Sequence, residues 1–251
     1  MISLSQRGDV TIATMAHGKA NALDVEFCIA LIEAFDELSR SQAKAVVLTA
    51  AGSIFSAGVD LPRLIEGGPA YAGLFLPTLS RAFEALFAFQ KPLVAGVNGH
   101  AIAGGCILAC AADRRLMARG VGRIGVPELL VGVPFPTVAL EIMRQAVPPP
   151  HLTTLISSAE TLPADLAKER GLVDAAVDSD RLLDEAVAAA AAMARLPADA
   201  FAITKKQLRG PSFALIREGQ TRVDRAITDY WSAPETLERI RTYVARTLKK
   251  P

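Results

Sequence analysis

Two glycine-containing loops carry residue types that can stabilise negative charge on a carbonyl oxygen. They are Phe55–Leu61, with the sequence FSAGVDL, and Asn98–Cys106, with the sequence NGHAIAGGC. Gly104 and Gly105 open a predicted helix, so their N–H groups lack partners inside that helix, and no side chain keeps a ligand oxygen away. Together the loops can form an oxyanion hole for an enolate or a tetrahedral intermediate. Ordinary turns that require glycine are the alternative interpretation.

A third candidate is Glu128, which lies in the apolar segment Val126–Val131. If it is buried, desolvation raises the pKa of its carboxyl group and makes it a base near neutral pH. A glutamate that leaves a strand end into solvent is the alternative. The sequence has no P-loop, HExxH, GxSxG or EF-hand motif, and its histidines lack ligand spacing, so no metal site is predicted.

Strands alternate with helices, which predicts an α/β fold with mostly parallel pairing. The two loops follow the predicted strands 45–49 and 93–97, and ligands of α/β sheets bind at such strand ends. From about residue 195 the chain is almost entirely helical and is predicted to form a separate subdomain. The predicted strands are 2–5, 9–15, 45–49, 93–97, 114–118, 123–126 and 173–177. The predicted helices are 24–39, a short one from about 60, 71–89, 104–112, 135–145, 151–158, 164–170, 180–196, 198–208, 212–228 and 234–248.

Composition narrows the class of protein. The 251 residues are 51% hydrophobic and 21% charged, which is globular composition. The 27 basic and 26 acidic residues nearly cancel, so no global field favours nucleic acid. Cys28, Cys106 and Cys110 form no CxxC motif and are predicted to be reduced core thiols. The uncharged run 92–112 is long enough to span a bilayer, but its polar residues and glycines favour a buried strand, loop and helix. We therefore expect a soluble cytoplasmic protein without a membrane partner.

These segments, in this order, resemble the enoyl-CoA hydratase/isomerase (crotonase) family. The supporting stretches are NAL at 21–23, FSAGVDL at 55–61, GVNGHAIAGGCILACAADRRL at 96–116 and VPELLVGVPF at 126–135. The resemblance implies a crotonase spiral of ββα units over residues 1–195, which holds the acyl-CoA site. It implies a C-terminal helical trimerisation region over 196–251, in a homotrimer or a dimer of trimers. Coenzyme A thioesters are the implied substrates, with no cofactor and no metal.

By motif position, the resemblance assigns the oxyanion-hole N–H groups to Val59 and Gly104 and the acid–base role to Glu128. It also implies a further set of contacts to coenzyme A or substrate: Lys19, Ala20, Ala57, Asp60, Leu61, Pro62, Ile107 and Arg246. Some of these have simpler interpretations. Lys19 and Arg246 can be solvated surface residues, and Asp60 can cap a helix. The pocket walls are expected within 61–76 and 133–143.

One position departs from the hydratase pattern. Hydratases of the family carry a second glutamate three residues after the oxyanion glycine, and that position is Ile107 here. One carboxylate in a dry pocket suits migration of a double bond better than addition of water. The favoured prediction is therefore a Δ3,Δ2-enoyl-CoA isomerase. The alternatives are a hydratase in which Asp60 or Glu66 replaces the missing group, and an acyl-CoA binder without catalysis.

Overall fold

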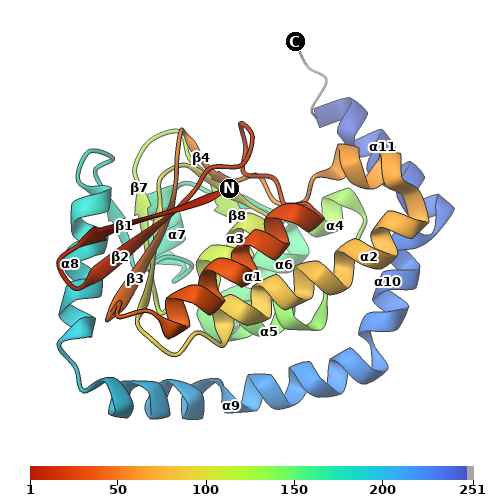
Figure 1. Cartoon of the computed structure of the whole chain (residues 1–251). Helices are drawn as coiled ribbons and strands as arrows, with labels where there is room; N and C mark the ends of the chain where they lie inside the picture. Colours follow the sequence, from red (N-terminus) through yellow and green to blue (C-terminus); the bar gives the residue numbers. More distant parts are fainter. Residues whose placement is uncertain (248–251) are drawn as a thin grey trace.

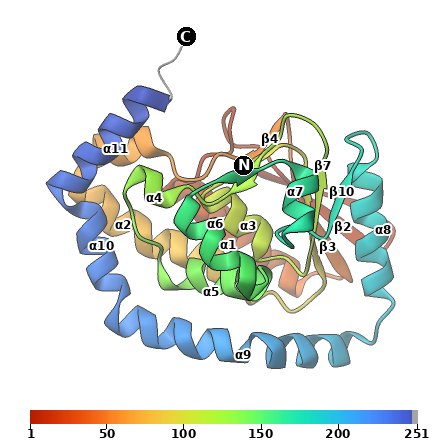
Figure 2. The same ribbon diagram turned by 180° about the vertical axis from the view of Figure 1, so that it is seen from behind.

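Ten strands and eleven helices make up residues 1–247, the part of the chain that the computed structural model describes (Figures 1 and 2). The strands are β1 (Ile2–Arg7), β2 (Val10–Met15), β3 (Ala45–Ala50), β4 (Ile54–Ser56), β5 (Leu93–Val97), β6 (His100–Ile102), β7 (Arg114–Ala118), β8 (Ile124–Gly125), β9 (Thr161–Leu162) and β10 (Ala175–Val177). The helices are α1 (Val25–Arg40), α2 (Leu61–Phe87), α3 (Gly104–Cys110), α4 (Glu128–Val131), α5 (Thr137–Ala146), α6 (Pro149–Ser158), α7 (Ala164–Glu169), α8 (Leu182–Ala194), α9 (Ala198–Arg222), α10 (Asp224–Ser232) and α11 (Pro234–Thr247).

The strands form two sheets. The larger has the order β1-β2-β3-β5-β7-β10, and all its pairs are parallel except β1–β2. The smaller has the order β4-β6-β8-β9, with only β8–β9 antiparallel. The predicted parallel α/β organisation is confirmed.

Both faces of the larger sheet are covered, which explains why its inner strands are continuous apolar runs. In β3, Val46 and Leu48 face the core that α1, α2 and α3 share, whereas Ala45 and Val47 face α8. This alternation follows from the two-residue period of a strand. Figures 1 and 2 show α1 and α2 side by side, with α8 across the sheet from them.

Helices α1 and α2 have identifiable starts and one kink. The predicted cap Asp24 accepts a hydrogen bond from the N–H of Phe27 at 2.7 Å and starts α1. The two helices predicted between residues 60 and 89 form the single element α2, bent at Gly68, whose φ is 60°. Glycine tolerates this φ, and Pro69 cannot donate to the helical ladder, so together they account for the bend.

The last three helices form an arm around the body. Helix α9 runs along its base, and α10 and α11 then pass beside α2 (Figure 1). Ile216, Ile227 and Ile240 from the arm join the same apolar core as α1 and α2. The arm therefore shares its core with the rest of the chain, and its role in trimerisation stays a prediction.

The predicted helix break between residues 208 and 212 is wrong. Helix α9 continues through Pro211 and ends at Arg222. Arg209 and Ser212 are both buried against the body and hold the helix on either side of the proline. Among the described residues, no single helix is long and apolar enough to cross a membrane. Helices α8 and α9 meet that criterion only as a pair, and the pair is bent by 102°.

Candidate active site

Three neighbouring parallel strands of the smaller sheet end at one edge, and each leads to one predicted site residue. Strand β6 pairs with β4 on one side and β8 on the other. Val59 follows β4, Gly104 follows β6 and Glu128 follows β8. The N–H of Ala103 donates to the carbonyl of Gly125 at 2.8 Å, which extends the pairing to the residue before Gly104. The sheet thus brings both loops and the glutamate together.

The strands that carry the loops differ from those predicted. The prediction placed the loops directly after the strands at 45–49 and 93–97, which belong to the larger sheet. Short strands, β4 and β6, lie between those strands and the loops. Each has only three residues, too few for a two-residue hydrophobic period to be recognised.

The first loop is held by pairing with the segment before α1. The N–H of Ala57 donates to the carbonyl of Ala20 at 2.9 Å, and that of Leu23 donates to Gly58 at 2.7 Å. The N–H of Val59 donates no hydrogen bond to any residue of the described chain. Its hydrogen therefore remains available for a ligand oxygen.

Two buried polar side chains fix this loop. The Asn21 side chain donates to the carbonyl of Ile54 at 3.0 Å and accepts from the N–H of His17 at 2.7 Å. The Ser56 hydroxyl donates to the carbonyl of Asn21 at 2.7 Å and accepts from the N–H of Gly58 at 3.2 Å. Ser56 was not among the predicted site residues. Its signal was a small polar residue at the end of an apolar run, next to a glycine turn.

The second loop packs directly against the first. A Cβ added at Gly58 would lie 2.6 Å from the carbonyl oxygen of Ile102 and 3.2 Å from the nitrogen of Gly104. A Cβ at Gly104 would lie 2.6 Å from Cδ1 of Leu23. Gly58, with a φ of 82°, is therefore required by close approach of backbone, whereas a side chain at Gly104 would have to displace the end of Leu23. Like Val59, Gly104 donates its N–H to no described residue, because it is the first residue of α3.

Glu128 is buried, with 8% of its surface exposed, so the alternative of a solvated carboxylate is excluded. Burial raises its pKa to about 8, and a hydrogen bond from its own backbone N–H opposes only part of that shift. Its Oε2 atom has no hydrogen-bond partner among the described residues. A desolvated carboxylate with a free oxygen is suited to take a proton from a weak carbon acid.

Helix α3 is apolar and fully buried. Ile107 is 1% exposed, and its N–H bonds back to the carbonyl of Ala103 at 3.2 Å. Cys106 lies near Glu128, whose negative charge adds to the increase in the pKa of that thiol; the larger causes are its contact with Cys110 and burial. All three cysteines are buried free thiols, as predicted. No group of three or more His, Cys, Asp or Glu side chains within residues 1–247 could hold a metal ion.

The remaining predicted contacts lie in three places. Lys19, Ala57 and Pro62 are exposed, whereas Ala20 and Leu61 are half-buried. Asp60 accepts the N–H of Arg63 at 3.0 Å and caps α2, which is the simpler of its two predicted roles. Arg246 is exposed on α11, at a cavity of about 790 Å³ that Leu129 and Leu130 of α4 also line. The assignment of these residues to coenzyme A stays a prediction.

An ion cluster beside the first loop was not predicted. Asp24 contacts Nε2 of His17 at 2.7 Å and accepts from Arg63 at 3.1 Å, while also capping α1. Arg63 lies in the first turn of α2, directly after the loop. The cluster thus ties the start of α1 to the start of α2 and limits movement of the loop between them.

Similarity to known proteins identifies the family of this chain. The family model described as enoyl-CoA hydratase/isomerase matches residues 6–243. The chain belongs to this family. A Thermus thermophilus protein, provisionally named an enoyl-CoA hydratase, is 34% identical over 194 residues, which are 76% of each chain.

Solved structures show the same fold. The human mitochondrial Δ3-Δ2-enoyl-CoA isomerase superposes with a TM-score of 0.94 over 99% of this chain and 98% of its own. The two sequences are 21% identical, so this likeness establishes the crotonase fold alone. A Mycobacterium tuberculosis protein, named an enoyl-CoA isomerase with one structure and a probable enoyl-CoA hydratase with another, is 30% identical with a TM-score of 0.81 in the first of these, over 87% of this chain and 95% of that one.

Proposed function

We propose that this member of the enoyl-CoA hydratase/isomerase family is a Δ3,Δ2-enoyl-CoA isomerase. The observation that carries the proposal is Glu128, a buried carboxylate with one free oxygen. The buried, apolar Ile107 occupies the sequence position at which hydratases of the family carry a second acid–base group. Val59 and Gly104 lie at the same edge of the smaller sheet, and neither donates its N–H to another described residue.

In this mechanism the thioester oxygen accepts the N–H groups of Val59 and Gly104. The ionised carboxylate of Glu128 removes a proton from C2, and the electron pair moves onto the oxygen to give a dienolate. The dienolate re-forms the carbonyl with the double bond between C2 and C3, and Glu128 returns the proton to C4. Atoms and charge balance, and no water is consumed. Loss of one oxyanion donor in other enzymes costs about 10²–10³ in rate.

The hydratase alternative needs a second group to hold and activate water. The sequence offers Asp60 and Glu66. The carboxylate of Asp60 is engaged at the N-terminus of α2, and Glu66 is exposed on that helix. Neither observation favours a second acid–base group beside Glu128.

The test is turnover of a 3-enoyl-CoA and, separately, of a 2-enoyl-CoA, with conjugation followed by absorbance and products by mass. We expect conjugation of the 3-enoyl ester without addition of water. Glu128→Gln should lower kcat by about 10²–10⁴. Hydration of the 2-enoyl ester would contradict the proposal. Unchanged turnover in Glu128→Gln would also contradict it, and tight ester binding without exchange of deuterium at C2 would favour the binder.

Ile107→Glu probes the same distinction from the other side. If the absence of a carboxyl group at residue 107 prevents the addition of water, this variant should gain measurable hydration of the 2-enoyl ester. Ile107→Leu is the matched control, because it keeps residue 107 apolar and should gain none.

A further inference from the structure

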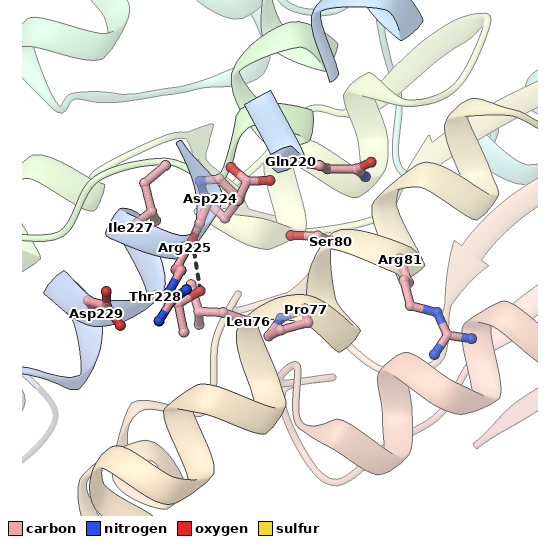
Figure 3. A pocket seen from close by; sticks show the side chains of 11 residues that line it. Leu76, Pro77, Ser80, Arg81, Gln220, Asp224, Arg225, Ile227, Thr228 and Asp229 are labelled. Atoms are coloured by element: carbon pink, nitrogen blue, oxygen red, sulfur yellow. Dashed lines mark hydrogen bonds between the residues drawn. The ribbon is translucent and has the colours of Figure 1, made fainter. Parts of the chain in front are cut away.

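A cavity of about 440 Å³ lies between the second half of α2 and the start of α10, away from the two loops (Figure 3). Leu76, Pro77, Pro136 and Ile227 give it apolar walls. Leu76 and Pro136 fall within the segments expected from the sequence to line the acyl pocket. The volume lies in the range of small-molecule sites, about 300–1,000 Å³.

Ser80 places a hydroxyl group in this apolar cavity. The residue is 8% exposed, and Figure 3 shows its oxygen directed into the space between α2 and α10. The hydroxyl donates no hydrogen bond to any residue among 1–247. A hydrocarbon that filled the cavity would leave this hydroxyl unpaired, which is unfavourable. A ligand with an oxygen at this depth would satisfy it.

The charged residues that line the cavity balance, and this indicates whether the ligand's oxygen-bearing group is neutral or charged. Arg81 and Arg225 line it together with Asp224 and Asp229. Asp224 is already engaged, because it accepts hydrogen bonds from the N–H and the hydroxyl of Thr137 at 2.9 and 2.7 Å. With two cations and two anions present, the cavity favours a neutral hydroxyl or carbonyl over a charged end group.

Phe83 of α2 links the neighbourhood of this cavity to the second loop. Phe83 follows Ser80 by three residues, or about 4.5 Å along the helix axis. A Cβ at Gly104 would lie 3.3 Å from Cζ of Phe83, so this ring borders the second oxyanion loop. From the other side, Ile227 lines both this cavity and the neighbouring one that reaches Leu129, the residue after Glu128. Ser80 is thus one helical turn along α2 from the residue whose ring borders Gly104.

We propose that this cavity receives the part of the acyl group beyond C4, and that Ser80 selects acyl groups with a hydroxyl or carbonyl oxygen in that part. The inference rests on the proposed isomerase function of Glu128. A four-carbon acyl group ends before the cavity, whereas an eight-carbon group enters it. Ser80 is accordingly a specificity-determining residue and takes no part in proton transfer.

The experiment compares three 3-enoyl-CoA esters: a four-carbon, an eight-carbon and a terminally hydroxylated eight-carbon ester. Ser80→Phe fills the cavity, and Ser80→Ala removes only the hydroxyl. Ser5→Phe is the matched control, because it makes the same change of side chain in a separate cavity of about 330 Å³ beside β1. For each protein, kcat/KM is measured with all three esters.

We expect Ser80→Phe to lower kcat/KM about tenfold or more for both eight-carbon esters and to change the four-carbon value less than about twofold. The wild type should prefer the hydroxylated ester over the plain one by about fivefold, and Ser80→Ala should abolish that preference. Ser5→Phe should preserve both selectivities. Equal losses for short and long esters in Ser80→Phe would overturn the inference, as would a wild type without preference for the hydroxylated ester.

Failure of the proposed function gives a different result. If the wild type turns over none of the esters, the isomerase assignment falls, and calorimetry with the same esters then tests the cavity alone. Tighter binding of the hydroxylated ester by the wild type, lost in Ser80→Ala, would still support the cavity. Equal binding of both eight-carbon esters would overturn it.

Discussion

A raised pKa makes the activity of Glu128 depend on pH in a defined direction. The carboxyl group must be ionised to remove the C2 proton, and burial raises its pKa to about 8. We therefore expect kcat/KM for a 3-enoyl-CoA to rise with pH, bend near 8 and reach a plateau above it. The measurement is a profile of kcat/KM between about pH 6 and pH 10. A profile that is flat throughout this range would contradict a base of raised pKa.

The same burial has an effect on stability that can be measured without substrate. Between its usual pKa of 4.5 and about 8, folded Glu128 holds a proton that the unfolded chain has released. The free energy of unfolding therefore falls as pH rises through this window, by at most about 1.4 kcal/mol per pH unit. Glu128→Gln removes this term. Its Tm should match the wild type below about pH 4 and exceed it increasingly up to about pH 8.

The exposed Glu66 provides the control for that measurement. Glu66→Gln should follow the wild type within about 0.5 kcal/mol at every pH. A constant difference between Glu128→Gln and the wild type across the pH range would mean that the carboxyl is not desolvated in solution.

The chemistry of individual residues was the feature that the sequence predicted best. Ile107 and Glu128 could be interpreted from sequence because the absence or presence of a carboxyl group is a matter of residue type. The burial of Glu128 could not be predicted from the sequence, because the same residues are compatible with a glutamate at a solvated strand end. It is settled only by packing within the fold.

At the scale of elements, contact between the two loops predicts a severe effect of one added methyl group. Gly58 has a φ of 82°, and a Cβ there would lie 2.6 Å from the carbonyl oxygen of Ile102. Gly58→Ala should therefore cost about 2 kcal/mol or more of stability and displace the N–H of Val59, lowering kcat/KM about 10²-fold. Thermal unfolding and turnover of a 3-enoyl-CoA check both effects.

Gly73 in α2 is the matched control, because a Cβ there would meet no atom within 4 Å. Gly73→Ala should keep full activity and gain up to about 1 kcal/mol of stability. Similar behaviour of the two variants would show that the loops do not pack as closely as in the structure.

Helices and strands were predicted correctly where they are long enough for the period of their hydrophobic residues to be recognised. The sixteen residues of α1 and the buried strands β3 and β5 were predicted within one or two residues. Strands β4 and β6 have three residues and β9 has two, and such lengths carry no readable period. They are held by neighbouring strands, so only the tertiary fold reveals them. The site depends on β4 and β6, and its sheet edge was therefore assigned to the wrong strands.

At the scale of the whole molecule, the arm is attached through charged residues, and their burial cannot be recognised from the sequence. Lys205 and Arg209 on α9 are 4% and 6% exposed, and both donate to Asp113, at 2.7 and 2.8 Å. In sequence, a lysine and an arginine on a helix suggest a solvated face. The structure instead docks α9 through buried cations, and α10 and α11 then reach α2.

This docking predicts a large effect from one lysine and none from its neighbour. Lys205 also donates to the carbonyl of Lys91 at 3.0 Å, and burial lowers its pKa to about 8. Lys205→Met leaves the carboxylate of Asp113 with one cation fewer, so we expect a loss of about 3 kcal/mol in denaturant unfolding. The exposed neighbour gives the control, since Lys206→Met should change stability by less than about 0.5 kcal/mol. Because α9 sets where α10 meets α2, Lys205→Met should also weaken the discrimination between eight-carbon and four-carbon esters at temperatures where it stays folded. Equal stabilities of the two variants would show that the arm is held by its apolar contacts alone.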